Sequence, residues 1–150
     1  MPNIQNINRM IALIDELYTN KPGGFAMATW RSLRFEAPID SPLTTCNTVA
    51  CLAGWAEHFI ETDSGGKISR TVAPGYFPCL WFGIDDRQQG ELFHMMNSDH
   101  LTLSKFDLLP AKVAHRTVRI LLEILRDRNT VDWDHAYELA LTQINNEPAP

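Results

Sequence analysis

The sequence predicts an all-α protein, built as a single compact domain of five or six helices with two long loops. Two observations predict this fold class: apolar residues recur at spacings of three and four along several segments, and helix-start signals precede most of those segments. A chain of 150 residues can bury about 70% of its unfolded surface, so it needs neither a metal nor a disulfide to fold. We assign the domain to residues 1–146 and expect a frayed tail at residues 147–150.

The N-terminal segment 4–18 is expected to form an amphipathic helix. Its predicted apolar face, at alternating spacings of three and four, is Ile4, Ile7, Ile11, Ile14 and Tyr18. Asn3 is a suitable N-cap, because its side-chain oxygen can accept a hydrogen bond from an amide of the first turn. The segment NKPGG at residues 20–24 ends the helix, since Pro22 cannot continue it.

Residues 46–60 are expected to form the second helix, with Thr44 or Thr45 as its N-cap. The small residues Ala50, Ala53 and Gly54 lie within this segment. Gly54 lowers helix stability by roughly 1 kcal/mol relative to alanine. The close approach of another backbone would offset that cost. We therefore expect this helix to carry a structural hub, defined as Cys51, Ala53, Gly54 and Trp55.

The middle of the chain contains signals for two further helices. The apolar segment 76–84 is expected to form a short buried helix. Asp85 or Asp86 then begins another, with Gln88 or Gln89 three residues later, which is the spacing of a capping box.

The C-terminal part is expected to hold a long helix over residues 110–126 and a last helix capped by Thr130. The segments 61–75 and 97–108 are polar or aperiodic and are the two predicted long loops, although 61–75 also fits a small hairpin. Residues 25–43 fit either a short helix or an extended segment followed by a proline-rich loop.

Composition excludes several classes of protein. The net charge of −5 argues against general binding to nucleic acids or membrane surfaces, which requires a basic balance. No apolar run reaches the roughly 18 residues of a membrane span, and we find no secretion signal at the N-terminus. Three cysteines without such a signal are typical of a reducing compartment, so we expect a cytoplasmic protein with free thiols.

Cys46 and Cys51 are spaced as C-x4-C, which raises the alternative of a zinc-stabilised structural protein. If both lie on one helix, their side chains point about 140° apart and their Cα atoms lie ~8.5 Å apart. That separation exceeds the ~7 Å limit of a disulfide. A metal site would need Cys79 or a distant histidine to complete it, so we assign no metal and no cofactor.

Cys46 carries a second alternative, a small cysteine-dependent enzyme. A thiol at a helix N-terminus has a lowered pKa, because the helix dipole and the unpaired amides favour the thiolate. With a histidine nearby in space, Cys46 would be the nucleophile. No catalytic constellation is complete in the sequence, so a protein without catalytic activity is the preferred interpretation.

One face of the predicted helix 110–126 is basic. Lys112, His115, Arg116 and Arg119 follow one another at spacings of three and four, which places them on one side of a helix. We call these four residues the basic face. The segment 105–126 carries an excess of three positive charges in an acidic protein. The common meaning of such a stripe is a solvated surface, and the functional one is a site for a phosphate, a nucleotide or an acidic partner.

The stretch CNTVACLAGWA at residues 46–56 resembles a motif of small uncharacterised proteins from bacteria, prophages and phages. That motif is Cys-Gly/Asn-Thr, two small residues, then Cys-aliphatic-Ala-Gly-Trp/His-Ala. The upstream FAMATWR and the downstream ELF and VDW are also similar to that group. The resemblance implies a mobile-genome origin and an intracellular role in a bacterial host. Small phage proteins of this kind often act by binding, for example by inhibiting a host defence factor.

Together these observations predict a non-enzymatic binding protein in the cytoplasm of a bacterial host cell. It would inhibit a host protein, or sequester a small anionic or nucleotide ligand, through the basic face and the two loops. A homodimer is compatible with the sequence.

Overall fold

Seven helices and one short antiparallel ladder make up the described part of the chain. The structure, a computed structural model, describes residues 1–20, 31–33, 48–64 and 76–149. In chain order the elements are α1 (Ile4–Asn20), β1 (Arg31–Leu33), β2 (Thr48–Ala50), α2 (Leu52–Asp63), α3 (Tyr76–Phe82), α4 (Asp86–His94), α5 (Leu103–Asp107), α6 (Ala111–Arg128) and α7 (Trp133–Asn145). The all-α prediction is confirmed. The extra helix is α5, which forms inside the segment predicted as the loop 97–108.

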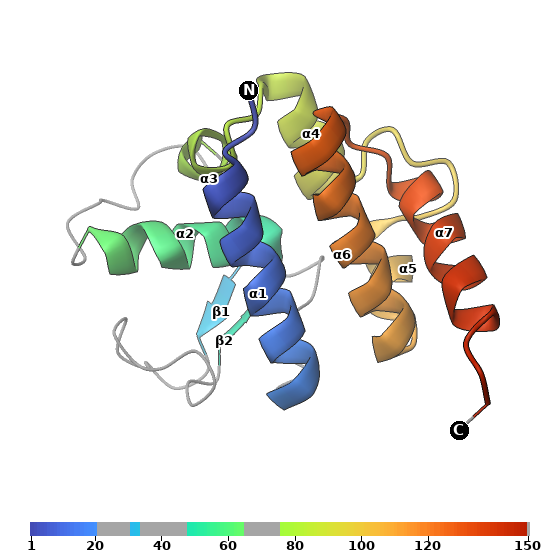
Figure 1. The fold of residues 1–150 in the computed structure, drawn as a ribbon. Coiled ribbons are helices and arrows are strands. Elements are labelled where there is room, and N and C mark those ends of the chain that lie inside the picture. Colours follow the sequence, from blue (N-terminus) through green and yellow to red (C-terminus); the bar gives the residue numbers. More distant parts are fainter. Residues whose placement is uncertain (21–30, 34–47, 65–75, 150) are drawn as a thin grey trace.

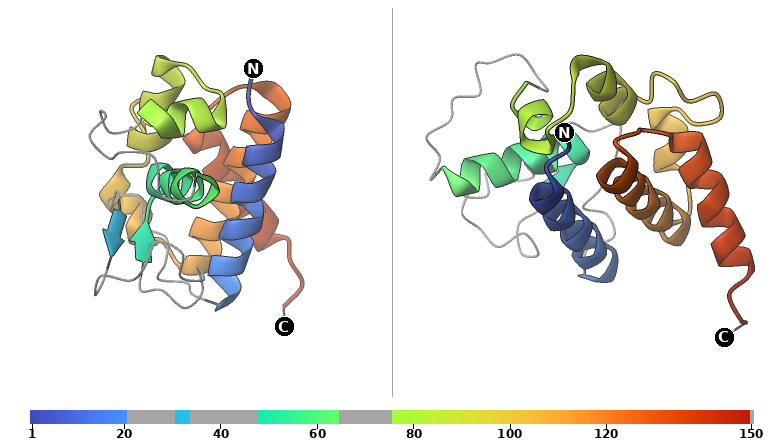
Figure 2. Two further views of the ribbon diagram at one scale, coloured as in Figure 1. Left: turned by 90° about the vertical axis from the view of Figure 1, so that its left-hand side faces the viewer. Right: turned by 45° about the horizontal axis from the view of Figure 1, so that its top comes forward.

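The helices α1, α6 and α7 lie side by side, with α6 between the other two and antiparallel to both (Figure 1). Turned views show α2 on the other side of α1, together with the β1–β2 ladder and α3 (Figure 2). α6 turns a continuous face into the core, formed by Thr117, Val118, Ile120, Leu121, Leu122 and Leu125. This arrangement leaves its polar side between α1 and α7.

The predicted helix 46–60 is wrong at its start. Thr48–Ala50 is a strand, paired antiparallel with β1 so that Val49 lies opposite Ser32. Thr48 and Val49 are β-branched residues that favour strands, and here they have a partner strand with which to pair. α2 begins only at Leu52, after Cys51 as an extended N-cap with φ −80° and ψ −177°. Thr44, Thr45 and Cys46 lie outside the described residues.

α1 buries a different set of residues from the one predicted. Ile7, Ile11 and Ile14 are buried, but Ile4 is 57% exposed. The helix completes its buried face with Met10, Leu13 and Leu17. Asn3 accepts a hydrogen bond from the Asn6 amide at 3.0 Å, as an N-cap residue does.

The helix ends show which local signals determine structure. The capping box at α4 is present: Asp85 accepts from the Gln88 amide at 2.8 Å, and Gln88 Oε1 accepts from the Asp85 amide at 3.0 Å. Gln88 Nε2 also donates to the Asn129 carbonyl at the end of α6, 3.0 Å away. The cap of α7 is Asp132, which accepts from the His135 amide, and the predicted cap Thr130 is wrong.

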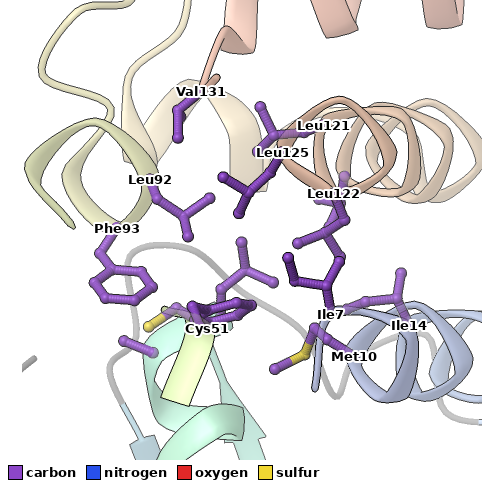
Figure 3. Close-up of a cluster of buried hydrophobic side chains, with 14 of the residues drawn as sticks. Ile7, Met10, Ile14, Cys51, Leu92, Phe93, Leu121, Leu122, Leu125 and Val131 are labelled. Carbon is purple, nitrogen blue, oxygen red and sulfur yellow. The ribbon is translucent and has the colours of Figure 1, made fainter. Parts of the chain in front are cut away.

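The core is one cluster of buried side chains. It joins the layer of α1, α6 and α7 to the side that holds α2 and α3. Figure 3 shows Ile7, Met10 and Ile14 of α1 facing Leu122 of α6, with Leu121 and Leu125 of α6 on the side of Val131. Cys51, at the start of α2, lies near Phe93 of α4 in the same view (Figure 3). All four residues of the predicted hub are buried, namely Cys51, Ala53, Gly54 and Trp55. No helix in the described part of the chain is long and apolar enough to cross a membrane.

Candidate anion-binding site

The four residues of the basic face belong to α6, the helix that lies between α1 and α7 (Figure 1). Because successive helical residues turn by about 100°, Lys112, His115, Arg116 and Arg119 fall on one side. The Lys112 and Arg119 side chains are 50% and 41% exposed, and Arg116 is 25% exposed. The structure therefore brings the four predicted residues together, with the His115 side chain only 15% exposed.

On the α7 side, the basic face is joined to Glu147. Arg116 Nη2 donates to Glu147 Oε1 at 2.6 Å, and Lys112 Nζ forms an ion pair with Glu147 Oε2. Arg116 Nη1 also donates to Gln143 Oε1 at 3.0 Å. Hydrogen bonds from Lys112 and then Arg116 lower the pKa of Glu147, so this carboxylate stays ionised at neutral pH. The tail residue Glu147 is thus tied to α6.

On the α1 side, the basic face is joined to Asp15. Arg119 Nη1 donates to Asp15 Oδ2 at 2.6 Å, and His115 Nε2 lies 2.7 Å from Asp15 Oδ1. The His115 ring stacks on Tyr18, with ring centroids 4.3 Å apart and planes inclined by 11°. The sequence places Tyr18 on the buried face of α1, but the residue is 37% exposed and its ring stacks on the imidazole.

A hollow of about 340 Å³ opens beside these side chains. Its lining residues are His115, Arg116, Arg119, Ile120, Glu123 and Gln143. Within the described residues, Arg119 donates through Nη1 to Asp15 and through Nε to Glu123, which leaves its Nη2 hydrogens for a ligand. We call this concave part of the surface the basic hollow. Its guanidinium groups can form paired hydrogen bonds to a carboxylate or a phosphate.

The two described cysteines lack the features of a nucleophile. Burial raises the pKa of the Cys51 thiol, more than the Gly54 and Ala53 amides lower it. Burial also raises the pKa of Cys79, whose Sγ donates to the Ile84 carbonyl at 2.8 Å. Both are neutral thiols at neutral pH, and the neutral thiol is a poor nucleophile. The helix-start position predicted for Cys46 belongs to Cys51, where burial outweighs the effect of the helix terminus.

A metal centre has no support among the described residues. In the ranges described, no three His, Cys, Asp or Glu side chains come close enough together to hold a metal ion. Cys51 and Cys79 are both buried in the core, packed among apolar side chains. The zinc alternative depended on Cys46 with Cys51, and Cys46 lies outside the described residues.

A second hollow, of about 170 Å³, lies where α4 meets the start of α7, but its polar groups have partners inside the protein. The carboxylate of Glu91 accepts from Asn97 Nδ2, and the Glu91 carbonyl accepts from Trp133 Nε1 at 2.9 Å. Ser98 Oγ donates to Asp134 at 2.7 Å. These contacts shape the connection between α4 and α5, so we do not assign a ligand to this hollow.

Asp134 organises that connection and makes it sensitive to acid. Its carboxylate accepts from Ser98 Oγ and from the amides of Asp99 and His100, at 2.7, 2.8 and 3.2 Å. Burial favours the neutral acid, but the hydrogen bonds from Ser98, Asp99 and His100 outweigh it, so the pKa of Asp134 lies below its ordinary value of 3.8. The folded state therefore holds this group ionised at a pH where the unfolded chain takes up a proton.

Replacing Asp134 with asparagine is expected to reduce the acid dependence of stability. A lowered folded pKa contributes stability that is complete above the unfolded pKa and is lost as the pH falls through the folded pKa. Asp134→Asn should thus lower the free energy of unfolding at pH 7 and flatten its decline between about pH 5 and pH 3. Urea unfolding at several pH values measures both quantities. Glu138→Gln, at an exposed carboxylate of the same helix, is the control, and equal slopes in the two variants would contradict the assignment.

Sequence reasoning found the cations of the site but missed the residues that hold them. Asp15 and Glu147 are the anions that orient the basic face, and Gln143 and Tyr18 complete its walls. Asp15 is 100 residues away from His115 in the chain, so no local pattern joins them. The sequence feature that could have identified Asp15 is its position. It directly follows the buried Ile14 and so lies at the edge of the apolar face of α1.

Comparison with known proteins gives no family for this fold and site. The chain matches no protein-family model, and it shows no significant similarity to a curated protein or to a solved structure.

Proposed function

We propose that the protein is a non-enzymatic binding protein that takes an anionic group, a carboxylate or a phosphate, on the basic face. The observation that supports this function is the basic hollow, where His115, Arg116 and Arg119 converge around about 340 Å³. That volume lies within the range of about 300–1,000 Å³ typical of small-ligand sites. The site offers charged donors and an apolar wall at Ile120.

The internal ion pairs of the basic face are compatible with ligand binding. Ion pairs between exposed side chains contribute only about 0.2–1 kcal/mol each, because water and salt screen them. Asp15 holds Arg119 in place and Gln143 holds Arg116 in place. Because these two side chains are already ordered, ligand binding costs less conformational entropy. An anionic ligand can therefore replace one of the internal partners.

The overall charge favours a small or locally acidic ligand over a polyanion. The chain has a net charge of −5, so a long nucleic acid would be repelled by most of the surface. A single anionic group in the basic hollow avoids most of that repulsion, because surface charges farther than about 8–10 Å are screened at physiological salt.

The wider setting of the proposal is a bacterial host cell, with a host protein as the source of the anionic group. This part rests on the resemblance of residues 46–56 to phage and prophage proteins, which implies action in the host cytoplasm, in the manner of an inhibitor of a defence factor.

Reversing two charges of the basic face is expected to abolish binding. We expect Lys112→Glu with Arg116→Glu to weaken binding of inorganic pyrophosphate by at least about tenfold, since each charge-assisted hydrogen bond contributes roughly 1.5–3 kcal/mol. Isothermal titration calorimetry at low salt measures the affinity. Absence of saturable binding by the unaltered protein, or unchanged binding by the double variant, would overturn the proposed site.

Two matched variants separate loss of the site from loss of the fold. Adding Glu147→Lys to the double variant restores opposite charges between α6 and the end of α7, but it does not restore the anion site. Arg126→Glu reverses one charge on α6, where the double variant reverses two, and it lies ten residues beyond Arg116 and thus ~15 Å along the helix. We expect Arg126→Glu to change the affinity less than about twofold because of screening.

A further inference from the structure

One internal carboxylate already lies on part of the proposed site. Glu147 places one oxygen on Lys112 and the other on Arg116, so a single carboxylate bridges an ammonium and a guanidinium. These are the contacts that an acidic side chain of a ligand would make with the same two cations. Glu147 belongs to neither helix, because α7 ends at Asn145 and its C-cap is Asn146.

The attachment of Glu147 is weak enough to be exchanged. Apart from the two ion pairs, its backbone is held by a single described hydrogen bond, from its amide to the Ile144 carbonyl at 3.2 Å. Its side chain is 33% exposed. Release of Glu147 therefore breaks two partly exposed ion pairs without opening the core.

We propose that Glu147 is an internal competitor on this site, and that the ligand is an acidic side chain of another protein, which displaces it. The inference rests on the proposed function and adds to it the class of ligand and a built-in restraint. With Glu147 in place, Lys112 and Arg116 are occupied. When an acidic segment binds, its carboxylate takes over these two cations.

The chemistry of the surroundings favours a protein carboxylate over a phosphate. Glu123 lines the basic hollow and Asp15 borders it, so the added charge of a phosphate dianion meets more repulsion than a carboxylate does. Gln143 and Ile120 also line the hollow, and they suit the amide and apolar parts of a peptide. Glu147 itself is a peptide carboxylate, held by the cations that the ligand would use.

Removing the competitor is expected to strengthen binding. The apparent affinity of a ligand is its intrinsic affinity multiplied by the fraction of molecules in which the site is open. The two partly exposed ion pairs keep Glu147 on the site in most molecules, so Glu147→Gln should bind an acidic peptide about two- to tenfold more tightly.

The probe is a capped peptide, Ile-Asn-Asn-Glu-Pro-Ala, which repeats residues 144–149 of the chain. Its counterpart with glutamine at the fourth position tests the requirement for the carboxylate. Binding to the unaltered protein and to Glu147→Gln is followed by NMR titration, which detects weak complexes. In the unaltered protein, the amide signal of residue 147 should move on binding toward its position in peptide-free Glu147→Gln.

Glu138→Gln is the charge-matched control. It removes one negative charge from α7, nine residues before Glu147 and thus ~13 Å along the chain, and Glu138 forms no ion pair among the described residues. An equal gain in affinity in Glu138→Gln would mean that charge alone explains the effect, and would overturn the role of Glu147.

Three further outcomes distinguish failure of the Glu147 competitor from failure of the proposed anion-binding function. Equal affinity of the unaltered protein and Glu147→Gln for the peptide leaves the anion site intact and overturns the competitor. A gain for pyrophosphate but none for the peptide overturns the ligand class. If neither protein binds either probe, the proposed function fails and the inference fails with it.

Discussion

Replacing Trp133 with alanine is expected to lower the free energy of unfolding by about 3–5 kcal/mol, the usual cost of removing a buried tryptophan. Trp133 is the first residue of α7 and is 3% exposed. Its ring packs edge-on against Phe106 of α5, with ring centroids 5.5 Å apart. Its indole donates to the Glu91 carbonyl of α4 at 2.9 Å. One side chain thus joins three helices, and no neighbour can fill its volume without moving.

Trp133→Phe is the matched variant for this prediction. Phenylalanine keeps an apolar ring but cannot donate to the Glu91 carbonyl, which leaves a buried acceptor without its donor. We expect a loss of about 1–3 kcal/mol, between the unaltered protein and Trp133→Ala. Urea unfolding followed by circular dichroism gives the three free energies. A loss below about 1 kcal/mol for Trp133→Ala would contradict the packing described here.

Replacing Gly83 with alanine is expected to cost about 2–4 kcal/mol. Gly83 follows α3 with φ +69°, a conformation that side chains of L-residues disfavour. An added Cβ would lie 2.6 Å from the Met1 carbonyl oxygen and 2.8 Å from the Asn3 amide nitrogen. Both atoms belong to backbone, and the Asn3 amide donates to the Phe82 carbonyl at 2.8 Å. The N-terminal segment would have to move away from α3.

Gly90 is the natural control, because it differs in both respects. It lies inside α4, where alanine is about 1 kcal/mol more favourable than glycine. An added Cβ would lie 2.6 Å from Met96 Sδ, but Met96 is 72% exposed and can turn aside. We expect Gly90→Ala to leave stability unchanged or to raise it by up to about 1 kcal/mol. A similar loss in both variants would show that the backbone contact at Gly83 does not matter.

Signals contained within a few residues of the chain predicted the structure well. The capping box of α4 depends on two residues three apart, Asp85 and Gln88, and it formed as expected. The spacing of Ala114, Val118, Leu121 and Leu125 predicts the inner face of α6, and the last three are fully buried while Ala114 is partly buried. Both features follow from the geometry of a single helix, so distant parts of the chain cannot easily change them.

Prediction failed where distant segments compete for the same backbone. The segment around Thr48 fits a helix by its spacing, yet its amides and carbonyls pair with β1. Local periodicity cannot reveal that a partner strand lies near residue 31. The same limit affected α1, where Ile4 continues the apolar pattern but is 57% exposed, because the pattern does not show which neighbours cover each turn of the helix.

The sequence by itself determined that the chain is helical and that Lys112, His115, Arg116 and Arg119 share one face, because both follow from the turn of a single helix. Only the tertiary structure decided which acidic side chains pair with that face. Packing of α1 and α7 against α6 brings Asp15 and Glu147 onto its cations, from positions 100 residues and 31 residues away in the chain. The physical reason is that ion pairs act through space, and the chain distance between charges says nothing about their separation once the helices have packed.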